Sequence, residues 1–220
     1  MTLWSPDGVR DGTPLPLLAV HDGPAYQEEA SLTAVATELM ETGRAPVLRI
    51  ALLHPGRRDE WYSASALYSR ALVGEVLPAI GRAVAVHGVP VGMGASLGGL
   101  AMLHAQRRYP HAFSGLFLQS SSFFMPRFDH MEKGFPRYGR IVRFVRTVVG
   151  APGADHPVPA TLTCARDEDN VHNNRRVTAA LKLQGYPADL VETPGRHDFP
   201  TWRAALEPHL PDLLAAAGSV

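Results

Sequence analysis

One serine has a setting that points to chemistry. Ser96 lies in the segment GASLGG, residues 94–99, which matches the pattern G-x-S-x-G of an activated serine nucleophile. An apolar run ends just before it, and a helical pattern over 97–108 follows directly, as this pattern requires. Small neighbours leave room for the strained turn that projects the hydroxyl from the edge of a sheet. A glycine-rich turn in any α/β protein would give the same short pattern, so other residues must decide.

A serine hydroxyl becomes a useful nucleophile only when a base takes its proton, and histidine has a suitable pKa. In chains with this pattern the base follows both the serine and an acidic residue. The sequence contains 10 histidines. His197 meets the condition of order, and it also lies between the last apolar run, 188–194, and the final helical pattern. We therefore predict that His197 is the base.

Three consecutive carboxylates are candidates for the acid that orients this histidine. Asp167, Glu168 and Asp169 follow the apolar run 159–165, after Arg166. Spacing alone does not choose among them. A solvated turn, or a cap for the helix expected from residue 172, would account for any two.

The elements that must position these residues alternate along the chain. Six β-rich runs are nearly all apolar, as in parallel strands covered on both faces: 15–20, 46–53, 89–95, 113–119, 159–165 and 188–194. Helical patterns lie between them, at 25–42, 63–86, 97–108, 172–184 and 201–216. In the last of these we expect Pro208 and Pro211 to kink or break the helix. The alternation predicts an α/β fold around a mostly parallel sheet with helices on both faces.

One stretch interrupts the alternation. Residues 122–157 contain several turns and an amphipathic helix around 137–149. Because they leave the carboxyl end of a strand, where ligands bind in such sheets, we expect a small cap over the site within a single domain, 1–220. On that helix Arg137, Arg140, Arg143 and Arg146 share one face. Either the face is simply solvated, or it forms a cationic wall for an anionic or catecholate substrate.

Several spaced motifs together resemble a known family. They are HDGPAY at 21–26, RRDEWY at 57–62, EVLP at 75–78, GASLGG at 94–99, Glu168 with NVHNNR at 170–175, and His197 with Trp202 and Arg203. The set resembles the α/β-hydrolase esterases that include esterase D, the mycolyltransferases and, nearest, the enterochelin esterases. This implies a three-layer α/β-hydrolase fold. It also implies a carboxylic ester hydrolase that acts through an acyl-enzyme.

The resemblance also implies roles for individual residues. It favours Glu168 as the acid, with Asp167 and Asp169 in reserve. It implies that the oxyanion is held by the backbone N–H of Leu97 and by the loop after the first run. The family position there is Pro24, which has no N–H, so Gly23 or Ala25 must donate, or the hydroxyl of Tyr26 must serve. We expect substrate contacts from four aromatic residues: Tyr26, Trp61, Phe123 and Phe124.

The composition and the motifs limit which binding partners are expected. Lys plus Arg and Asp plus Glu each number 21, which gives no electrostatic case for nucleic acid or an anionic membrane. With a lone cysteine, no signal sequence and no spanning apolar run, we expect a cytoplasmic protein. No metal-ligand or phosphate-loop motif is present, so we expect no cofactor and no metal. The expected partner is a small-molecule ester, and the sequence carries no signal for an oligomeric state.

Three alternatives to an esterase remain open. An acyltransferase would use the same acyl-enzyme with an alcohol acceptor. A peptidase could use the same residues on an amide. A ligand-binding protein could retain the fold without catalysis, although it would need none of Ser96, Glu168 and His197.

Overall fold

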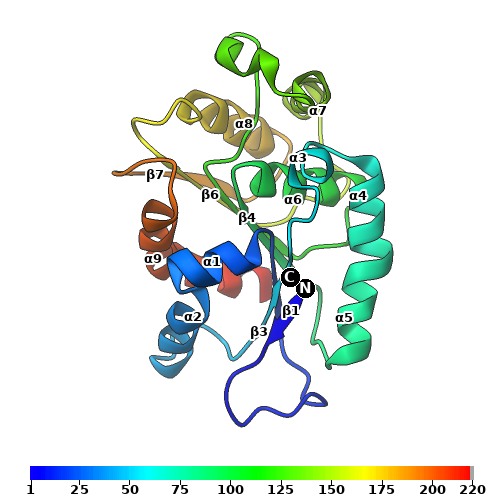
Figure 1. Cartoon of the computed structure of the whole chain (residues 1–220), viewed down its shortest axis with the longest axis vertical. Helices are drawn as coiled ribbons and strands as arrows, with labels where there is room; N and C mark the ends of the chain where they lie inside the picture. Colours follow the sequence, from blue (N-terminus) through cyan, green and yellow to red (C-terminus); the bar gives the residue numbers. More distant parts are fainter. Residues whose placement is uncertain (219–220) are drawn as a thin grey trace.

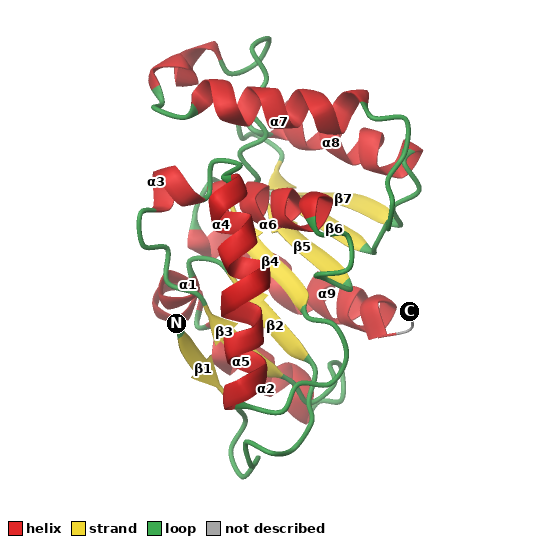
Figure 2. Ribbon diagram, turned by 90° about the vertical axis from the view of Figure 1, so that its right-hand side faces the viewer, coloured by secondary structure: helices red, strands yellow, loops and turns green. Residues whose placement is uncertain are grey.

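The computed structural model describes residues 1–218, and its centre is a twisted sheet of seven strands (Figures 1 and 2). Across the sheet the order is β1-β3-β2-β4-β5-β6-β7, and every pair is parallel except β1 with β3. The strands are β1 (Thr2–Trp4), β2 (Leu17–Val20), β3 (Arg49–Leu52), β4 (Val91–Ala95), β5 (Gly115–Gln119), β6 (Ala160–Ala165) and β7 (Ala188–Thr193). The six predicted runs thus each contain one strand, and the expectation of a mostly parallel sheet is confirmed.

Both faces of the sheet are covered, which is why the strands are nearly all apolar. In β2, Leu17 and Ala19 pack into one hydrophobic core, whereas Leu18 and Val20 pack into a second core on the opposite face. Successive side chains of a strand point to opposite faces, so an apolar residue is needed at every position. The fold is therefore a three-layer arrangement with two separate cores.

The helices are divided between the two faces (Figure 2). One face carries α1 (Gly23–Ala30), α2 (Leu32–Glu41) and α9 (Phe199–Gly218). The other carries α4 (Ala66–Ala71), the π-helical turn η1 (Leu72–Val76), α5 (Leu77–Ala83), α6 (Leu97–Arg108) and α8 (Val171–Leu183). The short α3 (Arg58–Trp61) lies at the end of the sheet where α4 begins.

Two predicted helices differ in detail. The helix expected over 25–42 is broken at Ser31, whose φ of 50° is left-handed, so that it forms α1 and α2. In contrast, the final helix continues through Pro208 and Pro211, where we expected a kink or break. The N–H missing at Pro211 leaves the carbonyl of Glu207 free, and Arg44 Nη2 donates to that oxygen at 2.8 Å. This substitute hydrogen bond helps the helix to persist.

The segment between β5 and β6 contains the expected amphipathic helix. It comprises the 3₁₀ turn η2 (His130–Gly134) and α7 (Tyr138–Gly150). On α7, Ile141, Val145 and Val148 are buried in the same core as α6 and α8. In both ribbon views α7 and α8 lie together, on the side of the sheet that also carries α6. Among the described residues no helix is long and apolar enough to cross a membrane.

Candidate active site

The turn between β4 and α6 places Ser96 at the carboxyl end of the central strand. Ser96 has φ 55° and ψ −124°, a conformation that costs a non-glycine residue energy. A Cβ on Gly94 would lie 2.6 Å from the carbonyl carbon of Gly98, so only glycine fits at that position. A Cβ on Gly99 would lie 2.1 Å from Ser121 Oγ. The glycines of the motif therefore permit a tight strand-to-helix turn that exposes the serine.

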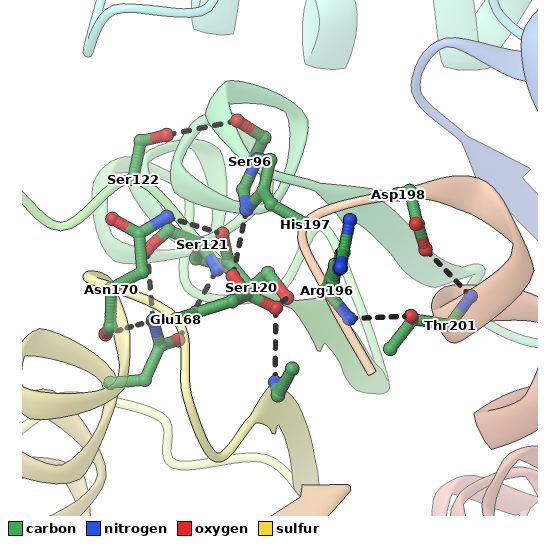
Figure 3. Close-up of polar contacts among 12 residues, drawn as sticks. Ser96, Ser120, Ser121, Ser122, Glu168, Asn170, Arg196, His197, Asp198 and Thr201 are labelled. Carbon is green, nitrogen blue, oxygen red and sulfur yellow. Dashed lines mark hydrogen bonds and ion pairs between the residues drawn. The ribbon is translucent and has the colours of Figure 1, made fainter. Parts of the chain in front are cut away.

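A second serine contacts Ser96. Ser122, just beyond the end of β5, places its Oγ 3.0 Å from Ser96 Oγ, and its backbone N–H donates to Ser96 O, also at 3.0 Å (Figure 3). Both hydroxyls line the same cavity. Sequence analysis missed Ser122. A signal was nevertheless present, since neighbouring parallel strands end at the same edge of a sheet and the run Ser120–Ser122 directly follows β5.

Of the three adjacent carboxylates, Glu168 is the one that contacts His197. Glu168 Oε2 lies 2.7 Å from His197 Nδ1. In Figure 3 the imidazole of His197 lies between Glu168 and Ser96. Asp167 and Asp169 are both exposed and line the cavity, whereas the side chain of Glu168 is buried, with the residue 8% exposed. The histidine arrives from the loop between β7 and α9, and the glutamate from the loop after β6.

The other carboxylate oxygen of Glu168 is also held. It accepts a hydrogen bond from Ser120 Oγ at 2.7 Å and one from the Ala165 N–H at 3.0 Å. Burial disfavours ionisation, but the hydrogen bonds from His197, Ser120 and Ala165 outweigh it and hold the pKa of Glu168 below its usual value. An ionised Glu168 fixes the Nδ1–H tautomer of His197. The other ring nitrogen, Nε2, is then left free to accept a proton.

A tryptophan supports this pair from α9. Trp202 Nε1 donates to Ser120 Oγ at 3.1 Å, and the indole meets the ring of His197 edge to face at a centroid distance of 5.1 Å. Asn170 Nδ2 donates to the backbone O of Ser120 at 3.1 Å. Ser120 itself has a left-handed φ of 43°. These contacts hold Glu168 and His197 in one orientation, which matters because catalytic groups must be placed to a fraction of an ångström.

Ser96, Glu168 and His197 all line one cavity of about 700 Å³. The segment after β5 contributes Phe124 and Phe135, whose rings meet edge to face at 6.0 Å. The complete lining is Ser96, Leu97, Ser122, Phe124, Glu132, Phe135, Asp167, Glu168, Asp169, Asn170, Gly195, Arg196 and His197. The volume suits a small organic molecule.

The loop after β2 was expected to supply an oxyanion donor. The N–H of Gly23 donates to Leu53 O at 3.0 Å, so it is already occupied, and Ala25 lies within the first turn of α1. Leu97, in contrast, lines the cavity at the first position of α6, where backbone N–H groups lack partners within the helix. The N-terminus of this helix also provides a positive potential for an oxyanion.

A histidine fastens that loop to the nucleophile turn. His21 is fully buried, and burial lowers its pKa to about 4, so it is neutral near pH 7. Its Nδ1 lies 2.9 Å from the carbonyl of Gly98, and its Nε2 lies 2.7 Å from Tyr68 Oη. Since a carbonyl only accepts, Nδ1 carries the proton and Tyr68 donates to Nε2. His21 thereby couples the loop to the first turn of α6.

The four aromatic residues expected to contact substrate lie in different places. Phe124 lines the cavity, whereas Phe123 is fully buried in a core. Tyr26 is also fully buried, and its hydroxyl donates to Gln119 Oε1 at 2.7 Å. Trp61 on α3 stacks on Tyr68, and neither it nor Tyr26 is among the described residues that line the cavity.

The arginines predicted to share one face of the helix over 137–149 do not line this cavity. Arg137 and Arg140 both form ion pairs with Glu60 of α3, and Arg140 also donates to backbone oxygens of Glu60 and Ser63. Arg143 lines a separate groove that also contains His104 and Phe144. Among the described residues, the one arginine that lines the Ser96 cavity is Arg196. A cationic wall at the site is therefore not formed by α7.

No group of three or more His, Cys, Asp or Glu side chains within residues 1–218 is arranged to hold a metal ion. The polar groups that converge on the cavity are a strained serine, a histidine–carboxylate pair and an unpaired helix N-terminus. This set is suited to nucleophilic attack on a carbonyl.

The chain is similar to known esterases. A family model described as "Putative esterase" matches residues 2–213. The Iron(III) enterobactin esterase of Dickeya dadantii (strain 3937) is 29% identical over 203 residues, which cover 87% of this chain and 46% of the relative. The chain thus spans about half the length of that curated relative.

Solved structures agree on the fold. A ferulic acid esterase superposes with a TM-score of 0.77 at 19% identity, over 97% of this chain and 91% of the other. The enterobactin esterase of Shigella flexneri, solved in the presence of enterobactin, gives a TM-score of 0.80 at 19% identity, over 97% of this chain and 54% of the other. With the family match over nearly the whole chain, the protein belongs to the putative esterase family and has the α/β-hydrolase fold.

Proposed function

We propose that the chain is a serine carboxylic ester hydrolase that acts through an acyl-enzyme. The observation that carries the proposal is the placement of Ser96, on a strained turn, in one cavity with the His197–Glu168 pair. Membership of an esterase family supports the same reaction. The similar proteins include esterases named for enterobactin and for ferulic acid, which supports the same type of reaction.

In the proposed mechanism Ser96 Oγ attacks the ester carbonyl carbon while His197 Nε2 takes its proton. In the free chain Ser96 Oγ is paired with Ser122, so the hydroxyl must first rotate toward His197. Glu168 stabilises the imidazolium, and Leu97 N–H donates to the oxyanion, a contact typically worth about 3–4 kcal/mol. The tetrahedral intermediate collapses as His197 protonates the leaving alcohol.

Water then attacks the acyl-enzyme, with His197 again taking the proton, and the carboxylic acid is released. A second oxyanion donor is required for full stabilisation. The N–H of Gly23 donates to Leu53 and the hydroxyl of Tyr26 donates to Gln119, so Ala25 is the remaining candidate from the sequence. The hydroxyl of Ser122 is a further donor close to the reacting atoms.

The test is labelling with a fluorophosphonate probe, together with turnover of p-nitrophenyl acetate. We expect the adduct on Ser96 by mass spectrometry, and a loss of kcat of at least about 10⁴-fold in Ser96→Ala. The matched control is Ser114→Ala, which removes a serine whose hydroxyl donates to the backbone of Val89. An adduct elsewhere, or activity retained in Ser96→Ala, would contradict the proposal. Acyl transfer to added alcohols would identify the acyltransferase alternative.

A further inference from the structure

The cavity that holds Ser96 is rich in carboxylates. Glu132 comes from η2, and Asp167 and Asp169 flank Glu168 in the loop after β6. Among the described residues none of these three side chains forms an ion pair, in contrast to Glu168, which is committed to His197. The one arginine in the lining is Arg196. Two separate segments therefore bring three carboxylates to a cavity whose lining holds one arginine, so the lining is net negative.

This charge is local. The whole chain has 21 basic and 21 acidic residues, so the molecule as a whole has no field that attracts cations. Arg137 and Arg140 do not offset these carboxylates, because both pair with Glu60. A cleft lined by one sign of charge focuses its potential and concentrates ligands of the opposite sign.

An independent feature of the same wall suits an organic cation. Phe124 and Phe135 lie in the lining next to Glu132, and aromatic faces attract ammonium groups.

We propose that the Ser96 cavity selects esters that carry an organic cation, a protonated or quaternary amine, over esters that carry a carboxylate. The inference rests on the proposed esterase function and specifies the substrate class of the same site. It reverses the anionic substrate that the arginine pattern of the sequence suggested. The carboxylates at the mouth attract the cation, and the phenyl rings contact its alkyl groups.

Three aryl acetates that share the acetyl group test this selectivity. They are (4-acetoxyphenyl)trimethylammonium, 4-acetoxybenzamide and 4-acetoxybenzoate, which are cationic, neutral and anionic. Each kcat/KM is divided by the rate constant for hydrolysis of that ester by hydroxide. This division corrects for the different intrinsic reactivities of the three leaving groups. We expect a cation-to-anion ratio of about 10 or more at low salt, falling as NaCl screens the carboxylates. A ratio of one or less would overturn the inference.

Variants identify the residues responsible. We expect the triple variant Glu132→Gln, Asp167→Asn, Asp169→Asn to lower the ratio at least about three-fold, since three charges are removed. Asp212→Asn, an exposed carboxylate on α9 outside the cavity, is the control and should leave the ratio as it is. Fluorophosphonate labelling of Ser96 verifies that each variant is folded. If the triple variant fails to fold, Glu132→Lys on η2 should shift the ratio in the same direction.

The two proposals fail in different ways. Hydrolysis of the neutral acetate that does not depend on Ser96 would overturn the proposed function. Hydrolysis that depends on Ser96, with no preference for the cation or with a preference that the triple variant leaves in place, would overturn the substrate class alone.

Discussion

At the scale of single residues, the notable feature is how one of three adjacent carboxylates differs from its neighbours. Glu168 is turned inward, where it accepts hydrogen bonds from Ser120, from the Ala165 N–H and from His197. Asp167 and Asp169 remain at the mouth of the cavity. The difference arises because the turn after β6, in which the N–H of Glu168 donates to Ala165 O, directs Glu168 toward the loop that holds His197.

Glu168→Gln tests the role of this carboxylate. A glutamine would present an amide N–H to His197 Nδ1, which favours the tautomer with the proton on Nε2, where it cannot accept the proton of Ser96. We expect kcat for p-nitrophenyl acetate to fall about 10³–10⁴-fold with a smaller change in KM. Asp167→Asn, which removes a neighbouring charge, should reduce kcat far less. An equal fall in kcat in the two variants would show that the contact between Glu168 and His197 does not contribute to catalysis.

The lowered pKa of Glu168 also predicts how stability depends on pH. A carboxylate whose folded pKa is depressed stabilises the fold above its unfolded pKa, and this contribution disappears as pH falls through the folded value. The free energy of unfolding of the wild type relative to Glu168→Gln should therefore be largest above the ordinary glutamate pKa of about 4.5 and shrink as the pH falls below it. Urea titrations of both proteins across this range measure it, and a difference that stays constant would contradict the cited hydrogen bonds.

At the scale of elements, the turn from β4 into α6 determines where Ser96, the proposed nucleophile, lies. Ser96 has a left-handed φ, Gly94 is in close contact with the backbone of Gly98, and His21 binds the carbonyl of the same Gly98. The first turn of α6 is thus held from two sides. Its free Leu97 N–H is consequently fixed relative to Ser96, as an oxyanion donor must be.

Gly94→Ala and Gly81→Ala form a matched pair that tests this turn. A Cβ on Gly94 meets backbone atoms that cannot move independently, so we expect a loss of about 1–3 kcal/mol in stability and a marked loss of kcat. A Cβ on Gly81, in α5, meets nothing within 4 Å, so the same change should stabilise by about 0.5–1 kcal/mol. Thermal or urea unfolding gives both values. Equal effects at the two positions would show that the turn tolerates a side chain.

At the scale of the whole molecule, the two cores on either side of the sheet enclose the strands that lead to the site. Cys164, in β6, is 1% exposed, and burial, with a smaller influence from Glu168, raises the pKa of its thiol to about 12. Both effects suppress the thiolate that reacts with disulfide reagents.

Cys164 therefore reports opening of the whole fold. In the native protein we expect its reaction with 5,5′-dithiobis(2-nitrobenzoate) to proceed only through unfolding, and to accelerate steeply with urea. Since the chain has 1 cysteine, denatured protein should release one equivalent of thionitrobenzoate. Rapid labelling without denaturant, at a rate independent of urea, would indicate that β6 opens locally.

The sequence alone determined the features that depend on local pattern. Runs of apolar residues indicated six of the seven strands, since a strand covered on both faces must be apolar at every position. Chain order and the glycine-flanked Ser96 indicated Ser96 and His197 as a pair, and a family resemblance indicated Glu168. The short antiparallel β1 was not predicted, because three residues carry too little periodicity.

Tertiary structure alone decided which side chains meet. Three such contacts join elements that are far apart in the chain: Ser122 with Ser96, the hydroxyl of Tyr26 with Gln119, and Arg140 with Glu60. No spacing rule within one segment gives the sign of charge in a cavity lined by several loops. Packing determines it: α7 buries Ile141, Val145 and Val148 in the core that also holds α6 and α8, and in this arrangement Glu132 lines the cavity whereas Arg137 and Arg140 pair with Glu60.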